Sequence, residues 1–227
     1  MNDRKKALLS QIIIEYIKSA TPVGSKLLEN KSSLGVSSAT IRNEMAELEK
    51  EGYIIQPHTS AGRVPTEKGY KFFLANYVKE GKISSKEEQS LRQSITQSQI
   101  AEETVKALAK RLVELSNNAV VAAFSPHNFY YTGLSSLFNQ PEFKNFNLIQ
   151  DISQIIDQLD NIVGGIFDDI DKTTVFIGSA NPFGDGCSVI LGRWKYKKIS
   201  GLMGILGPMR MDYEKNLGLI NFITSLK

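Results

Sequence analysis

The sequence has 227 residues, 41% of them hydrophobic and 22% charged, and none of its apolar runs approaches the roughly 18 residues that a membrane span needs. This composition excludes a disordered or membrane-spanning chain and suffices for one large or two modest domains. The net charge of +3 lies entirely in residues 1–80, which hold twelve Lys or Arg and nine Asp or Glu, whereas residues 81–227 hold fifteen of each. A basic first third is the direction expected for a domain that binds phosphate.

The amino terminus and the single cysteine indicate a cytoplasmic protein. The segment "MNDRKKALLSQIIIEYIKSATPVGS" begins with basic residues, but Glu15 and Lys18 interrupt its apolar residues and no small-residue cleavage site follows, so we expect no secretion signal. Cys187 alone excludes an internal disulfide and a cysteine zinc cluster. Its simplest interpretation is a buried thiol in a reducing cytoplasm.

Two helices are expected before residue 35. Apolar residues recur with helical spacing from Asp3 to about Ser19, where Pro22 and Gly24 end the pattern. The segment "SKLLEN" predicts a short second helix, and "KSSLGV" predicts a turn. The stripe of the first helix consists of Leu9, Ile12, Ile13, Tyr16 and Ile17.

A third helix, a hairpin and a fourth helix follow. Ser37 or Ser38 can cap the third helix, and Gly52 supplies its stop. The short run "YII" and the residues after "SAGR" predict two arms of a hairpin with "QPHTSAG" as its loop. Thr66 can cap a helix that runs to about Glu80, with Tyr70, Phe73, Leu74 and Tyr77 as its packing stripe.

This order of elements predicts a winged helix-turn-helix, in which the third helix enters the major groove of DNA and the hairpin touches the backbone or minor groove. If Ile41, Met45 and Leu48 face the core, the polar side chains of the first two turns project away from it. Arg42 can donate a forked pair of hydrogen bonds to guanine, and Asn43 can pair with adenine. The short donors for phosphate or base edges are Ser37, Ser38 and Thr40.

The later turns of the third helix are acidic and are therefore expected to face away from DNA. The hairpin loop has small residues that permit close approach to a backbone, and Arg63 supplies a permanent cation. Alone, this loop would be interpreted as an exposed turn whose charge aids solubility; beside a candidate recognition helix, a DNA contact is favoured. His58 is interpreted as a loop hydrogen-bonding residue and not as a metal ligand, and we expect no metal site or cofactor. The loop candidates for DNA contact are His58, Thr59, Ser60 and Arg63, and the acidic residues are Glu44, Glu47, Glu49 and Glu51.

A polar segment, "EGKISSKEEQS", begins a second region. Ser85 and Glu88 have capping-box spacing, and helical character continues to about Leu115, so we expect one long helix. Such a helix either covers the second domain or pairs with its counterpart in another subunit.

After residue 118 the β-prone runs "AVVAAF", "NFYYTGL", "TTVFIG", "CSVILGRWKY" and "LMGILG" predict a mixed sheet with helices on one or both faces. A stripe of apolar residues with helical spacing lies between "NFYYTGL" and "TTVFIG" and predicts a helix there. The segment "MDYEKNLGLINFITSL" predicts a final helix that Asp212 can cap. In "GPMRMDY", Arg210 is expected to pair with an acidic neighbour. The helical stripe consists of Leu148, Ile152, Ile155, Ile156 and Leu159.

The segment "LGVSSATIRNEMAELEKEGYIIQPHTSAGRVPTEKGY", Leu34 to Tyr70, resembles the amino-terminal signature of the HrcA family, the heat-inducible transcription repressors of bacteria. It shares the "SSATIRNEM" helix, the "PHTSAGR" wing and the "VPT" before the next helix. The segments "FYYTGLSSLFNQPEF", "VFIGSANPF" and "ILGPMRMDYEKNLGLI" resemble later motifs of the family in the same order. The resemblance covers both ends of the chain and lacks much of the family's middle region, which carries an inserted dimerisation segment.

The resemblance implies an α+β protein with a winged helix-turn-helix domain at residues 1–82, a connecting long helix at 83–118, and a shortened GAF-like mixed α/β domain for regulation and dimerisation at 119–227. It implies a repressor of chaperone genes that binds double-stranded operator DNA. An inverted-repeat operator requires a two-fold protein, so a homodimer is expected. We further expect release from the operator on heat stress, and the family implies that a chaperonin helps to maintain the active repressor.

Three other functions are weighed against this one. GAF folds often hold small ligands, so the alternative is a winged-helix regulator whose second domain senses one, with Gly178 to Ser188 as the ligand loop; a plain connection between strands is favoured there, because its glycines lack phosphate-loop spacing. An enzyme is disfavoured, since the cluster of Asp168, Asp169 and Asp171 is typical of a solvated loop and no catalytic constellation is evident. A winged helix that binds protein would expose an apolar face on the third helix, which here is polar.

Overall fold

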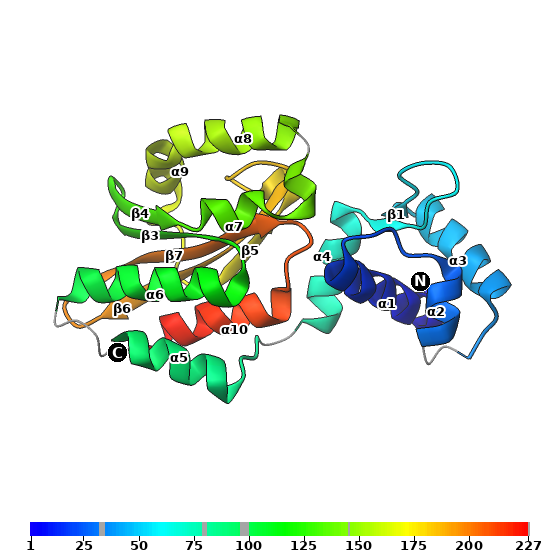
Figure 1. Cartoon of the computed structure of the whole chain (residues 1–227), viewed down its shortest axis with the longest axis horizontal. Helices are drawn as coiled ribbons and strands as arrows, with labels where there is room; N and C mark the ends of the chain where they lie inside the picture. The colour runs from blue at the N-terminus through cyan, green and yellow to red at the C-terminus, as the bar shows by residue number, and fades with distance from the viewer. Residues whose placement is uncertain (32–34, 79–80, 96–99, 145, 227) are drawn as a thin grey trace. The chain divides into compact units, whose positions relative to one another are not determined.

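The computed structural model in Figure 1 describes residues 1–31, 35–78, 81–95, 100–144 and 146–226, except for the side chains of residues 146–151. The chain divides into two compact units, residues 1–79 and 80–227. Among the described residues, no helix is long and apolar enough to cross a membrane.

The first unit consists of four helices and a two-stranded hairpin. Its core is the set of apolar side chains that the helical periodicity places inward, including Ile12, Ile41 and Leu48, each with no exposed surface. In the packing stripe expected for the fourth helix, Tyr77 is not buried: it is 43% exposed and stacks on Phe73. The elements are α1 (Asp3–Ser19), α2 (Ser25–Lys31), α3 (Ser38–Lys50), β1 (Ile54–Ile55), β2 (Val64–Pro65) and α4 (Glu67–Tyr77).

The helix ends follow from local capping. The Ser37 side chain accepts a hydrogen bond from the backbone N–H of Thr40 at the start of α3, and Thr66 caps α4 in the same way through Gly69. Both caps confirm the sequence prediction. Part of the expected turn before α3, residues 32–34, lies outside the described residues.

The hairpin is short, and the segment between α1 and α2 pairs with it on the loop side of its strands. Ile54 pairs with Pro65 and Ile55 with Val64. Beyond these pairs, Val23 and Arg63 exchange two backbone hydrogen bonds of 2.9 Å. A Cβ on Gly62 would lie 2.5 Å from the Val23 backbone, so only glycine permits this approach.

The second unit places a sheet between helices (Figure 1). Its five strands have the order β4-β3-β7-β6-β5, and every neighbouring pair is antiparallel. The helices are α5 (Ser85–Ile95), α6 (Ala101–Ser116), α7 (Leu134–Phe138), α8 (Phe146–Asp157), α9 (Leu159–Ile166) and α10 (Tyr213–Thr224), with short 3-10 turns η1 (Pro141–Lys144) and η2 (Gly178–Ala180). The strands are β3 (Ala119–Ser125), β4 (Asn128–Thr132), β5 (Thr174–Ile177), β6 (Cys187–Tyr196) and β7 (Ile199–Pro208).

Both faces of this sheet are covered. Alternate residues such as Val121, Val189 and Leu191 pack with α7, α8 and α9, and the opposite face of the sheet contacts α6 and α10. The expected mixed sheet is therefore wrong: the sheet is antiparallel throughout. Strands buried on both faces read as continuous apolar runs, which removes the alternation that marks antiparallel strands with one exposed face.

The expected long helix is also wrong, because two helices, α5 and α6, occupy this region and contact each other. Ile100 has extended backbone angles before α6 begins, and residues 96–99 lie outside the described residues. Amphipathic spacing continues across both helices without Gly or Pro, so periodicity does not locate the break. The capping box lies one residue earlier than predicted, where Ser84 and Glu87 exchange hydrogen bonds of 2.8 and 3.3 Å. This region was expected either to cover the second domain or to pair with another subunit. In the structure, α6 covers the sheet of its own unit.

Three other expectations for the second unit hold. Cys187 is buried, and Arg210 donates to Glu142 over 2.5 Å and to Gln140 over 3.0 Å. Asp212 caps α10 through Lys215. The expected stripe between β4 and β5 is split between α8 and α9; the side chain of its first member, Leu148, lies outside the described residues.

Candidate nucleic-acid interface

The first turn of α3 is tied to α2. The Ser38 N–H donates to a Glu29 carboxylate oxygen over 2.9 Å, and the Ser38 hydroxyl lies 3.2 Å from that of Ser25. The hydroxyls of Ser37 and Thr40 lie 3.1 Å apart. The three hydroxyls expected to contact DNA therefore also fix the start of α3, and one of its N–H groups is occupied by a carboxylate.

One face of α3 is exposed, and it carries the two side chains predicted to read bases. Ile41, Met45 and Leu48 are buried, whereas Arg42 and Asn43 are exposed. The helical spacing extends this face to residues that the sequence analysis missed, although counting four and eight residues on from Arg42 would have found two of them. These additions are Ala39, Ala46 and Lys50, all exposed.

The acidic residues of α3 and its carboxyl-terminal cap are paired with cations from α1 or the hairpin; these residues are Glu44, Glu47, Glu49 and Glu51. Glu44, which is 6% exposed, accepts from Arg4 over 2.6 Å. Lys5 forms ion pairs with Glu47 and, over 3.3 Å, with Glu51.

The pair of Lys5 and Glu47 shifts the pKa of both groups. The hydrogen bond from Lys5 lowers the pKa of the Glu47 carboxyl, and the same bond raises the pKa of Lys5. The acidic flank of α3 is therefore compensated, and the exposed face keeps the charges of Arg42 and Lys50. No hydrogen bond or ion pair joins either cation to another described residue.

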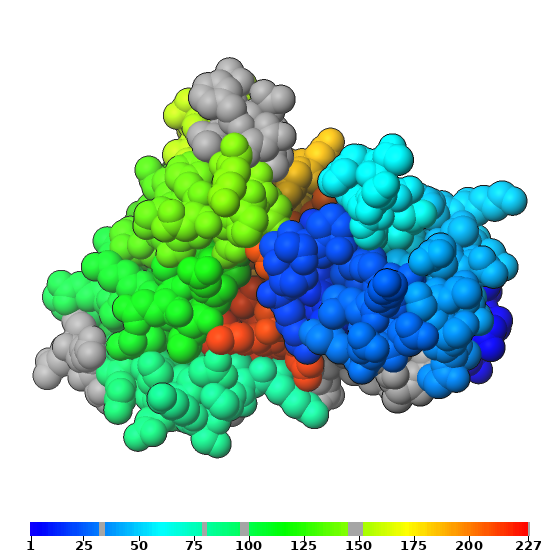
Figure 2. Space-filling view, turned by 45° about the vertical axis from the view of Figure 1, so that its right-hand side comes forward, coloured from blue at the N-terminus to red at the C-terminus, as the bar shows by residue number. Residues whose placement is uncertain are grey.

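The loop of the hairpin stands at the surface of the first unit, where Figure 2 shows it in cyan. His58, Thr59 and Ser60 are all exposed. The Ala61 N–H donates to the His58 carbonyl over 3.0 Å, and Ser60 adopts a left-handed conformation with φ 67°. Three of the four predicted loop residues are thus displayed together.

Arg63 differs from its expected place. Its side chain is 18% exposed and lies where the loop meets β2, with Nη2 and Nε 2.9 and 3.0 Å from the same carboxylate oxygen of Glu49. The structure brings it to α3 instead of displaying it with the loop.

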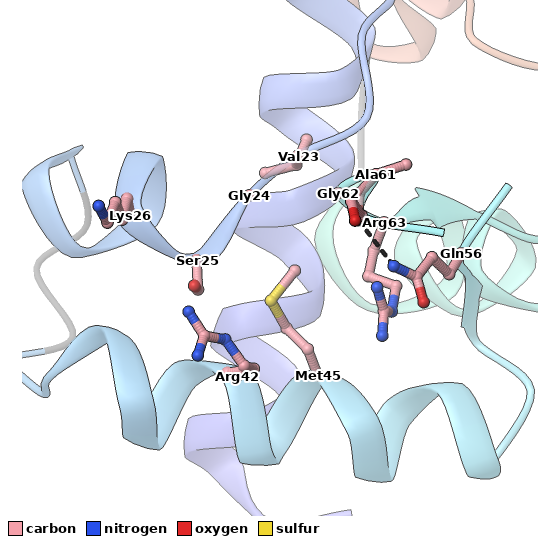
Figure 3. A pocket seen from close by; sticks show the side chains of 11 residues that line it. Val23, Gly24, Ser25, Lys26, Arg42, Met45, Gln56, Ala61, Gly62 and Arg63 are labelled. Atoms are coloured by element: carbon pink, nitrogen blue, oxygen red, sulfur yellow. Dashed lines mark hydrogen bonds between the residues drawn. The ribbon is translucent and has the colours of Figure 1, made fainter. Parts of the chain in front are cut away.

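A cavity of about 410 Å³ lies between α2, α3 and the hairpin (Figure 3). Arg42 points from α3 toward Ser25, and Gln56 donates to the Ala61 carbonyl over 3.0 Å on the opposite side. The cations Lys26, Arg42 and Arg63 all border the cavity. A groove that combines cations with small polar groups suits a phosphate backbone.

Comparison with known proteins decides the family. Residues 73–217 match the model of the HrcA protein C-terminal domain, which is more than half of the chain. The chain belongs to the HrcA family.

An HrcA relative that aligns along nearly its whole length is longer than this chain. The heat-inducible transcription repressor HrcA of Brevibacillus brevis is 26% identical, with 98% of this chain and 96% of that protein covered. That alignment spans 326 positions, 99 more than the 227 residues of this chain, so the relative has a long additional sequence without a counterpart here. The heat-inducible transcription repressor HrcA of Pelotomaculum thermopropionicum is 51% identical over 40% of this chain and 26% of its own length.

A solved structure described as a hypothetical protein at 2.2 Å resolution has the same fold, with a TM-score of 0.74 and 19% identity over 99% of this chain and 96% of that one.

The other candidate sites of this HrcA family member are less developed. Asp168 and Asp169 lie exposed in a turn after α9, as a solvated loop would. Gly178 to Ser188 comprises the connection from β5 to β6 and the first two residues of β6, and its residues 183–187 border a cavity of about 360 Å³ with Ile152 and Ile155. Among the described residues, no group of three or more His, Cys, Asp or Glu side chains is arranged to hold a metal ion.

Proposed function

We propose that this chain is a DNA-binding transcription repressor that acts in the cytoplasm and contacts double-stranded operator DNA through α3 and the hairpin loop, in the manner of a winged helix-turn-helix. The observation that carries this proposal is the charge arrangement of α3. Its glutamates are compensated on one flank, while Arg42 and Asn43 are exposed on the other. The names of the HrcA relatives, heat-inducible transcription repressors, support the same function.

Within this proposal, the side chains divide into base readers and backbone contacts. Arg42 reads guanine and Asn43 reads adenine, because both project from the first two turns of α3 and match those base edges. Ser37, Ser38 and Thr40 contact phosphate or base edges, and His58, Thr59 and Ser60 contact the DNA backbone.

The operator is an inverted repeat, and a homodimer occupies it, because a two-fold site requires a two-fold protein. The second unit is a GAF-like domain, which its five-stranded antiparallel sheet with helices on both faces supports. Heat weakens the fold or the dimer and releases the operator, and a chaperonin helps to maintain the active form.

Selection of bound sequences from random duplex DNA, combined with a mass measurement of the complex, tests the operator, its symmetry and the number of subunits together. We expect an inverted repeat and two copies of the chain. Failure to enrich any sequence would refute the proposed function.

A gel-shift series with the selected operator tests the regulation. Affinity is expected to fall as the temperature rises and to recover with added chaperonin. Affinity that stays flat with temperature would exclude heat release.

The second candidate function is ligand sensing by the second unit. The cavity beside Gly178 to Ser188 favours it, since Gln154, Gln158 and Asp185 add polar groups to an apolar lining. A thermal-shift screen of small metabolites, repeated with Phe183→Ala, tests this: a ligand that stabilises both proteins equally does not bind in this cavity.

A further inference from the structure

We infer that Arg63 is a positioning residue, which together with Glu49 and Gln56 forms a clasp that holds the hairpin against α3 in the geometry needed to contact DNA. This inference rests on the proposed DNA-binding function and changes the role of Arg63 from a direct contact to a support. We call the set Glu49, Gln56 and Arg63 the Glu49 clasp.

One carboxylate holds both arms of the hairpin. Glu49 Oε2 accepts from Nε and Nη2 of Arg63, over 3.0 and 2.9 Å. Its other oxygen, Oε1, accepts from the backbone N–H of Gln56 over 2.9 Å. Gln56 follows β1 and Arg63 precedes β2, so the two arms are joined to α3 directly below the exposed loop.

The hairpin needs this support because its own pairing is minimal. Each strand has two residues, and one of the four, Pro65, has no N–H to donate. A two-stranded hairpin is marginally stable in water even when it is longer. The clasp holds the Arg63 side chain and the Gln56 backbone at the loop end of the strands, and the two Val23 hydrogen bonds hold the Arg63 backbone at the same end.

Burial argues against a direct role for Arg63. Its side chain is 18% exposed and that of Glu49 is 33% exposed. The Glu49 carboxylate occupies two of the five guanidinium N–H groups, and its negative charge opposes the approach of a phosphate to the same guanidinium. In contrast, Arg42 is exposed and has no such partner among the described residues.

The two roles predict opposite signs for Glu49→Gln. This change removes a negative charge and frees Arg63, so a direct contact by Arg63 would make binding tighter. If the clasp positions the loop, binding becomes weaker, because the loop occupies its binding geometry for a smaller fraction of the time. The glutamine oxygen still accepts from the Gln56 N–H, so the variant isolates the ion pair.

The test measures operator affinity by fluorescence anisotropy over a range of salt concentrations. We expect Glu49→Gln and Arg63→Gln each to weaken binding about fivefold, which equals about 1 kcal/mol, the upper range for a partly exposed ion pair. The slope of log K against log salt stays that of the wild type. Lys18→Gln, which removes an exposed charge from α1, is the matched control.

Two further measurements separate positioning from a general loss of structure. The double variant Glu49→Arg, Arg63→Glu restores the ion pair with its charges exchanged and is expected to recover part of the affinity that each single reversal loses. Hydrogen exchange of the Gln56 amide is expected to speed up in Arg63→Gln while the amides of Ile12 and Leu48 keep their protection.

The outcomes are distinguishable. Tighter binding by Glu49→Gln, or a slope reduced by about 0.9 in Arg63→Gln, would show that Arg63 contacts phosphate and would overturn the clasp. Wild-type protein without operator-selective binding would instead refute the proposed function.

Discussion

Replacing Arg42 with alanine separates the reading of DNA from the stability of the fold. Arg42 is exposed, and no hydrogen bond or ion pair joins its side chain to another described residue, so its removal breaks no such interaction within the described part of the chain. The free energy of unfolding is therefore expected to change by less than about 0.5 kcal/mol. The loss of a forked pair of hydrogen bonds to guanine is expected to cost about 1–3 kcal/mol of operator affinity and to relax the preference at one base position.

The assay is a titration of the selected operator and of duplexes with single base-pair changes. The matched control is Lys198→Ala, which removes one exposed positive charge from the turn between β6 and β7 in the second unit. Arg42→Ala should bind the parent operator and the duplexes changed at the base pair that Arg42 reads with equal affinity. An equal loss on every duplex would mean that Arg42 contacts phosphate and not a base, and a fall in stability would refute its placement on the free face of α3.

Three other predictions concern stability. Gly62→Ala is expected to destabilise the first unit and weaken DNA binding, because its Cβ would lie 2.5 Å from the Val23 backbone; urea unfolding with unchanged stability would contradict this contact. Leu48→Ala should cost about 2–5 kcal/mol in urea unfolding, since this side chain has no exposed surface, and a cost below about 1 kcal/mol would mean that the site is not a packed core. The hydrogen bond from Lys215 lowers the pKa of the Glu87 carboxyl from 4.5 to about 2, so the stability it contributes is present above pH 4.5 and is lost as the pH falls toward 2. Glu87→Gln should therefore reduce stability by about 1 kcal/mol at pH 7 and by much less at pH 3, and equal losses at the two pH values would exclude this pair as the cause.

The amino-terminal ends of three helices and the exposed face of α3 were predicted correctly from the sequence. Ser37, Thr66 and Asp212 cap the helices that the sequence predicts, because a cap is a bond between residues three apart. Arg42 and Asn43 were placed on the exposed face for the same reason: 3.6 residues per turn fixes which side chains oppose a buried stripe.

Contacts between elements were decided only by the tertiary structure. The ion pair of Arg63 and Glu49 joins residues fourteen positions apart in the sequence, and this spacing does not predict it. The helical period is the same before and after the break between α5 and α6, and burial of both faces of the sheet removed the alternation that marks antiparallel strands. The sequence by itself therefore determined the local elements and the face of α3, because these depend on bonds within a few residues. The tertiary structure decided strand direction, helix breaks and the partners of each charge, because these depend on where distant segments meet.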